Sequence, residues 1–135
     1  MEDPKDGDER SILQGWLSFH REVLAKKCAG LSSAELVTRS APPSKLTLLG
    51  LVRHMTEMER VYLVYSLGPP GELHLVYGVY EDGGPEWDFD VDESMVEASF
   101  ELWHQERRAA DALLETYPEL DAPGSGNRRS VRWNL

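Results

Sequence analysis

The sequence predicts an all-α protein, a bundle of helices in one domain, and three observations lead to this prediction. Three segments, each roughly 20 residues long, carry apolar side chains at the spacing of an amphipathic helix. Residues typical of helix caps stand near their ends, and stretches rich in proline or glycine separate them. At 135 residues with 41% apolar content, the chain is long enough for one core and too short for two domains.

The first helix is expected from Arg10 to Gly30, after a polar leader, residues 1–9, that we expect to be disordered. Gly30 suits the position just after a helix, where the backbone takes a positive φ. Residues 10–135 then form the single helical domain. The apolar stripe of this helix consists of Ile12, Leu13, Trp16, Leu17, Val23 and Leu24.

The second helix is expected over residues 45–67. Residues 39–43 break the chain before it, and Ser44 stands where an N-terminal cap is needed. Upstream of the break, Ser32 and Glu35 form a capping-box pattern that predicts one short helical turn. The apolar stripe of the second helix consists of Leu48, Leu51, Val52, Met55, Met58, Val61, Tyr62 and Tyr65.

The third helix is expected to open with another capping box, Ser94 with Glu97. It continues to Tyr117, because Pro118 cannot extend a helix. Its apolar stripe consists of Val96, Phe100, Trp103, Ala110, Leu113, Leu114 and Tyr117.

The connections on either side of the third helix differ in character. Residues 68–92 form a long loop, in which the β-forming residues 73–80 favour a short hairpin. Residues 122–127, APGSGN, are typical of a flexible linker. Ser130 then suits the cap of a fourth helix, of which the sequence supplies one turn, VRWNL.

Charge and composition exclude several classes of partner. The net charge is −10 and the isoelectric point is about 4.8, whereas nucleic acids and anionic membranes are bound by clustered Lys and Arg. No apolar stretch approaches the roughly 18 residues of a membrane span. The single cysteine, Cys28, has no partner for an internal disulfide, so we expect a cytoplasmic protein in which Cys28 is a small buried residue.

His54 is the candidate functional residue of the second helix. It lies one turn from Leu51 and from Met58, so its side chain falls on the apolar stripe. An inward imidazole can ligate a metal, exchange a proton, or fill the core with its hydrogen bonds satisfied. His20 has a similar place on the first helix. No H-x-x-x-H, H-E-x-x-H or C-x-x-C pair is present, so residue spacing alone does not complete a metal site.

Glu57 offers two interpretations. Arg53 precedes it by four residues and Arg60 follows it by three, which is the spacing of ion pairs on a helix surface. The alternative is a supporting role behind a metal ligand.

The stretch PPSKLTLLGLVRHMTEMERVYL, with KKCAGLSSAELVTRSA before it, resembles the actinobacterial DinB-like proteins of unknown function. These proteins belong to the DinB and mycothiol-dependent enzyme superfamily. The acids of DFDVDES and the segment SVRW are similar to that family too, so the resemblance covers residues 10–135.

The resemblance implies an up-down four-helix bundle that binds a divalent metal, zinc or nickel, through three side chains. His54 matches the ligand of the second helix. The other two ligands usually follow the S-x-R-W segment as H-x-x-x-H, and the sequence stops at Leu135 without them. We therefore expect a C-terminally truncated domain with its fourth helix largely missing, either a piece of a longer protein or a variant that has lost the site.

Two functions remain open at this point. The resemblance implies a metal-dependent transferase or isomerase that uses a low-molecular-weight thiol and a small-molecule substrate, with His54 holding the metal. The alternative is a non-catalytic helical module without a metal, whose uncovered apolar strip binds a partner helix or forms a homodimer.

Overall fold

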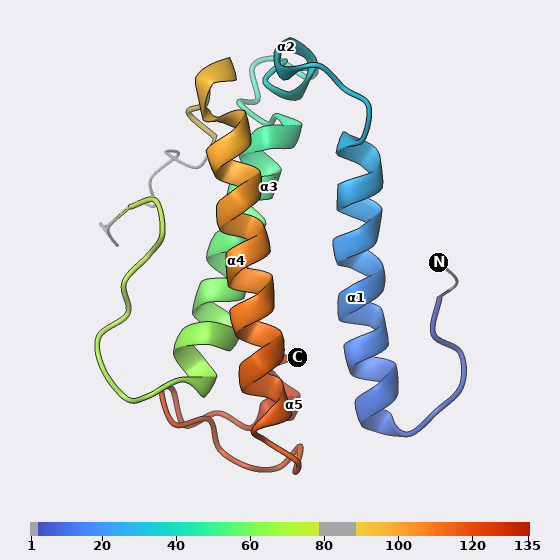
Figure 1. Ribbon diagram of the computed structural model, residues 1–135, viewed down its shortest axis with the longest axis vertical. Coiled ribbons are helices and arrows are strands. Elements are labelled where there is room, and N and C mark those ends of the chain that lie inside the picture. Colours follow the sequence, from blue (N-terminus) through green and yellow to red (C-terminus); the bar gives the residue numbers. More distant parts are fainter. Residues whose placement is uncertain (1–2, 79–88) are drawn as a thin grey trace.

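The computed structural model describes residues 3–78 and 89–135. Within these ranges the chain forms helices and no strand, which confirms the predicted all-α fold (Figure 1). No helix in those ranges is long and apolar enough to cross a membrane. The elements are α1 (Glu9–Cys28), α2 (Ser33–Leu36), α3 (Leu48–Glu59), η1 (Arg60–Tyr65), η2 (Glu93–Met95), α4 (Val96–Glu115) and α5 (Val131–Asn134).

Helix α1 starts one position earlier than expected because Asp8 caps it. The Asp8 carboxylate accepts a hydrogen bond from the backbone N–H of Ser11 at 2.8 Å. The helix ends at Cys28, and Gly30 has a φ of 77°, the left-handed conformation expected just beyond a helix. The division between leader and domain at residue 10 stays a prediction.

The caps of α2 and α3 confirm one prediction and correct another. Ser32 and Glu35 form the predicted capping box, in which each side chain accepts the backbone N–H of the other residue. Ser44 does not cap the second long helix, because its hydroxyl accepts a backbone N–H two residues further on. The cap is Thr47, whose hydroxyl accepts the Gly50 N–H at 2.9 Å, and α3 begins directly after it.

The second long helix reaches Leu67 as expected, but its geometry changes on the way. Helix α3 continues into η1, a π-helical stretch that begins at Arg60. The Ser66 hydroxyl donates to the carbonyl of Val61 at 2.6 Å, close to the end of this stretch. Stretches of π-helix inside α-helices are frequent at functional sites, so the residues around η1 are candidates for one.

The third helix has a different cap from the predicted one. Asp92 accepts the backbone N–H of Ser94 at 2.8 Å, so Ser94 is a donor here and not the cap. One turn of 3₁₀-helix, η2, then leads into α4. The predicted hairpin is wrong for residues 73–78, which form bends and coil, while residues 79–80 lie outside the described residues.

The segment expected to be a flexible linker, residues 122–127, is packed against the end of the second long helix. The backbone N–H of Gly126 donates to the Ser66 carbonyl at 3.0 Å. A Cβ on Gly126 would stand 1.9 Å from the Tyr65 carbonyl oxygen, so only glycine permits this approach. The segment leads to α5, which Ser130 caps as predicted.

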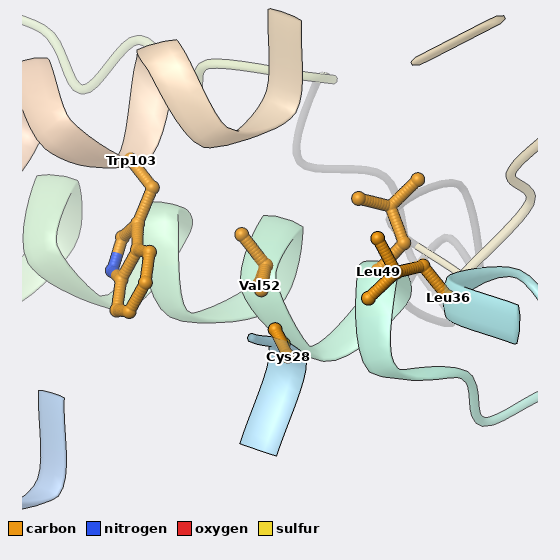
Figure 2. Close-up of a cluster of buried hydrophobic side chains, with 5 residues drawn as sticks. All are labelled: Cys28, Leu36, Leu49, Val52 and Trp103. Atoms are coloured by element: carbon orange, nitrogen blue, oxygen red, sulfur yellow. The ribbon is translucent and has the colours of Figure 1, made fainter. Parts of the chain in front are cut away.

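Helices α3 and α4 lie side by side and form most of the core, whereas α1 is farther from both (Figure 1). One cluster joins residues of all three helices and α2, as Figure 2 shows. A second cluster lies at the other end of the bundle, where η1, α4 and α5 meet. The buried members of the first cluster are Cys28, Leu36, Leu49, Val52 and Trp103, and those of the second are Leu63, Leu67, Ala110, Leu114 and Val131.

Candidate functional site

His54 is half-buried on α3, next to the chain that follows the long loop. Its ring stacks on that of Phe89, with ring centroids 5.8 Å apart. Gly50, one turn earlier on α3, makes this contact possible, because a Cβ there would stand 2.5 Å from the Phe89 ring. The sequence therefore places an imidazole and a phenyl ring together on a helix face that glycine keeps free of a side chain.

The residues around His54 bear on the expectation that His54 ligates a metal ion. A catalytic zinc site takes about three protein ligands and keeps one position open. Residues 3–78 and 89–135 contain no group of three His, Cys, Asp or Glu side chains that could hold a metal ion. His54 and the other described residues thus do not form a complete metal site.

Glu57 is buried rather than part of a solvated helix surface. Its side chain is 3% exposed, and its Oε1 accepts the backbone N–H groups of Val76 at 2.6 Å and Tyr77 at 3.1 Å. The guanidinium of Arg53 lies 3.9 Å from the centre of the Tyr77 ring. The expected surface location of Glu57 is therefore wrong: the carboxylate fastens the loop after the second helix to α3.

A second candidate site is a cavity of about 420 Å³ between α1, α3 and α4. Its walls are mostly apolar, with four charged or titratable side chains among them. His20 and Lys27 are exposed on α1, while Arg21 and Glu59 are buried. The apolar wall includes Leu17, Leu24, Leu48, Leu51, Met55 and Trp103.

Arg21 and Glu59 form a buried ion pair beside this cavity. Arg21 Nε and Nη2 donate to the two carboxylate oxygens of Glu59 at 2.6 and 2.7 Å, and the side chains are 6% and 4% exposed. Arg21 Nη1 also donates to Asp111 at 2.7 Å. Burial opposes the charge on the guanidinium, but the two carboxylates outweigh it and raise the pKa of Arg21. A two-point pair of this kind fixes the position of α1 against α3.

Next to that pair, the start of η1 and helix α4 share further polar groups. Arg60 Nη2 donates to Glu106 Oε1 at 2.6 Å, and burial raises the pKa of Glu106 even though Arg60 opposes the change. Among the described residues, Arg60 Nε, Glu106 Oε2 and the indole Nε1 of Trp103 are buried without a hydrogen-bond partner. The bundle therefore buries several polar groups beside its apolar clusters.

Sequence reasoning missed these buried polar groups, although one signal was present. Glu59 follows Met55 by four residues and Val52 by seven, so it lies on the same inward stripe as they do. A carboxylate on such a stripe requires a buried cation. No pattern in the sequence selects Arg21 as that cation, because the two residues are brought together by the packing of separate helices.

The remaining candidates stand apart. His20 is exposed and stacks on Trp16 with ring centroids 5.7 Å apart, so it lines the cavity mouth but is not a core residue. Cys28 is 6% exposed, and burial raises the pKa of its thiol, which agrees with the predicted inert role.

The fold and these surroundings define a class of protein: a small all-α bundle with an apolar cavity and buried polar groups between its long helices. A family model described as mycothiol S-transferase matches residues 12–135. The chain belongs to this DinB-like family, which confirms the resemblance. Comparisons with curated proteins and with solved structures gave no significant match.

Proposed function

We propose that this protein binds a low-molecular-weight thiol, of the mycothiol type, and joins the whole thiol through its sulfur to a small electrophilic substrate, with loss of the thiol proton and of the leaving group that the substrate carries. The family match over residues 12–135 carries this proposal. A thiol attacks an electrophile as the thiolate, so the site has to favour loss of the thiol proton. Cys28 is unsuited to this chemistry because its buried thiol has a raised pKa, so the reacting sulfur comes from a bound cofactor.

We assign His54 to the thiol site of this transferase. Its half-buried imidazole, stacked on Phe89, can accept a proton from a thiol or contribute one ligand to zinc or nickel. A metal at this position needs ligands beyond the groups that the described residues supply. When bound, such a metal would stabilise a thiolate. Gly50 supports the assignment, because it lets Phe89 hold the imidazole against α3.

The test is a conjugation assay with the purified chain, mycothiol and chlorodinitrobenzene, with and without added zinc or nickel. We expect turnover with mycothiol and not with glutathione. His54→Ala should abolish turnover above the uncatalysed rate, while His104→Ala, an exposed histidine on α4, should leave it unchanged. Metal content after purification without chelators separates the two roles of His54: bound metal lost in His54→Ala supports ligation, and active metal-free protein supports proton transfer.

A second function is favoured by the weaker packing of α1. Trp16 and Val23 on this helix are 38% and 37% exposed; Val23 lines the cavity, and Trp16 stacks on His20, which lines it too. A homodimer or partner helix covering this strip is the function of a non-catalytic module. Size-exclusion chromatography over a range of concentrations tests this function. A monomer at every concentration would exclude homodimerisation, whereas inactivity in the conjugation assay would exclude the transferase function.

A cytoplasmic location of the protein stays a prediction.

A further inference from the structure

The cavity between α1, α3 and α4 follows helix α1 over most of three turns. The residues of α1 that line it extend from Leu17 to Lys27, which is about 15 Å of helix at 1.5 Å per residue. The wall between these two positions includes Leu24 of α1 and Leu51 and Met55 of α3, whose side chains are apolar. A long and mainly apolar cavity suits the hydrocarbon part of a ligand.

The charged side chains on the cavity wall cancel each other, with one exception. Arg21 Nε and Nη2 donate to both carboxylate oxygens of Glu59 at 2.6 and 2.7 Å, so each of these charges is balanced by the other. The second acid that contacts Arg21 is Asp111, which is 58% exposed, lies outside the lining and is screened by water. Lys27 is the charge that remains on the wall.

Lys27 holds its charge at the mouth of the cavity. Its side chain is exposed, and in the part of the chain that the structure describes it forms no salt bridge. A lysine that lines an apolar wall does so with its hydrocarbon stem and keeps its ammonium group in water. Lys26 stands in the same last turn of α1, where a cation favours the helix end, but it does not line the cavity. Lys27 therefore offers a cation to a ligand and Lys26 does not.

The other groups near the wall favour an anion over a cation. His20 lines the cavity with an imidazole, which carries an N–H donor and no negative charge. Behind the wall, the guanidinium of Arg107 lies 4.8 Å from the centre of the Trp103 ring, and Glu22 balances it. The net charge of −10 repels anions at long range, but salt screens exposed charges beyond about 10 Å, so Lys27 decides the binding at the mouth.

We propose that this cavity binds a small amphipathic acid, with its hydrocarbon body along the apolar wall and its carboxylate beside the ammonium group of Lys27. The cavity of about 420 Å³ is of the size that small ligands occupy. Burial of the hydrocarbon body supplies most of the affinity, and the charge pair at the mouth selects the anion. This binding requires neither a thiol nor a metal, so it holds or fails independently of the proposed transferase activity.

The test compares four probes at constant ionic strength: octanoate, octanol, octylammonium and acetate. The first three share one hydrocarbon chain and differ in the charge of the head group, while acetate has the head group alone. The backbone amide resonances of the nitrogen-labelled chain are followed by NMR during each titration. We expect octanoate to bind saturably and about 3- to 10-fold more tightly than octanol, octylammonium to bind more weakly than octanol, and acetate not to bind.

A matched pair of lysine variants tests the head group. Lys27→Ala should remove the preference for octanoate over octanol, a change of about 3- to 10-fold, and Lys27→Arg should retain it. Lys26→Ala removes the same charge from the same turn of α1, outside the lining, and should change the preference by less than about 2-fold. Equal losses in Lys26→Ala and Lys27→Ala would show that general electrostatics and not a site selects the anion, which would overturn the proposal.

A second pair of variants on α1 tests the place of the hydrocarbon chain. Val23→Trp adds a large side chain on the cavity wall, at a position exposed enough to tolerate it, and should abolish saturable binding of octanoate. Ser18→Trp adds the same side chain at an exposed position outside the lining and should leave binding unchanged. The proposal is overturned if octanoate binds no more tightly than octanol to the wild-type chain, or if Val23→Trp binds octanoate as the wild type does.

Discussion

Two regions of this molecule are held together by different forces. Helices α3 and α4 meet through side chains that exclude water, such as Leu49 and Trp103, at 0% and 1% exposure. On α1, the buried residues are Arg21 and Cys28, and arginine contacts add to the apolar packing of Leu17 and Leu24. Arg10 donates to the backbone carbonyls of Tyr117 and Leu114 at the end of α4.

This difference indicates which contacts between the helices tolerate small shifts and which do not. Apolar burial is non-directional and tolerates small shifts, whereas a buried ion pair is costly to leave half-formed. Helix α1 is therefore kept in one position against α3 and α4 by Arg21 and its partners. The candidate cavity lies along this boundary.

The largest effect is expected from breaking the buried pair. Glu59→Ala leaves Arg21 buried with only Asp111, which is 58% exposed, and should lower the free energy of unfolding by about 3–5 kcal/mol. Asp111→Ala, the control, should cost less than about 1 kcal/mol because the pair it removes is open to water. Urea denaturation measures both. Equal losses in the two variants would show that α1 is not held by the Arg21–Glu59 pair.

Matched leucine truncations compare the apolar packing of the two regions. Leu49→Ala in α3 should cost about 2–5 kcal/mol, because it leaves a cavity at a fully buried site. Leu24→Ala in α1 removes a partly buried side chain and should cost about 1 kcal/mol. Thermal and urea unfolding give the two values. A larger loss of stability for Leu24→Ala than for Leu49→Ala would show that α1 contributes more apolar packing energy than the α3–α4 region does.

The helix caps give a smaller difference that depends on pH. Thr47→Ala removes the cap of α3 and should cost about 1 kcal/mol at any pH. Asp8 caps α1 as a carboxylate, and its hydrogen bond from Ser11 lowers its pKa below 3.8. Its contribution is present above the unfolded-state pKa and is lost as the pH falls through the folded-state value. The stability gap between wild type and Asp8→Ala, measured by urea denaturation at a series of pH values, should therefore close in acid, whereas the Thr47→Ala gap persists.

The smallest effect concerns the outer contact between α1 and α4. Arg107 Nη2 lies 3.3 Å from Glu22 Oε1, and the two side chains are 19% and 39% exposed. A double-mutant cycle with alanine at both positions should give a coupling below about 0.5 kcal/mol, and added salt should reduce it further. A coupling above about 1 kcal/mol would mean that solvated charges also hold α1 in place.

The sequence by itself determined the helices, because periodicity and caps are local properties. The capping box at Ser32 and Glu35, the cap at Ser130 and the positive φ at Gly30 all follow from near neighbours in the chain. The errors in the caps were local competitions between similar residues, as when Thr47 and not Ser44 capped α3. The family was also readable, because the segment around His54 carries it.

Tertiary structure alone decided what fills the space between the helices. Arg21 and Glu59 are 38 positions apart. The helical periodicity of the sequence indicates that each side chain faces inward, but it does not indicate that the two are in contact. The burial of Glu57 under Val76 and Tyr77 likewise depends on the path of a loop that has no repeating pattern. Desolvation depends on the packing of the whole molecule. The cavity, and the Trp103 N–H that is buried without a partner among the described residues, therefore follow only from the assembly of the helices.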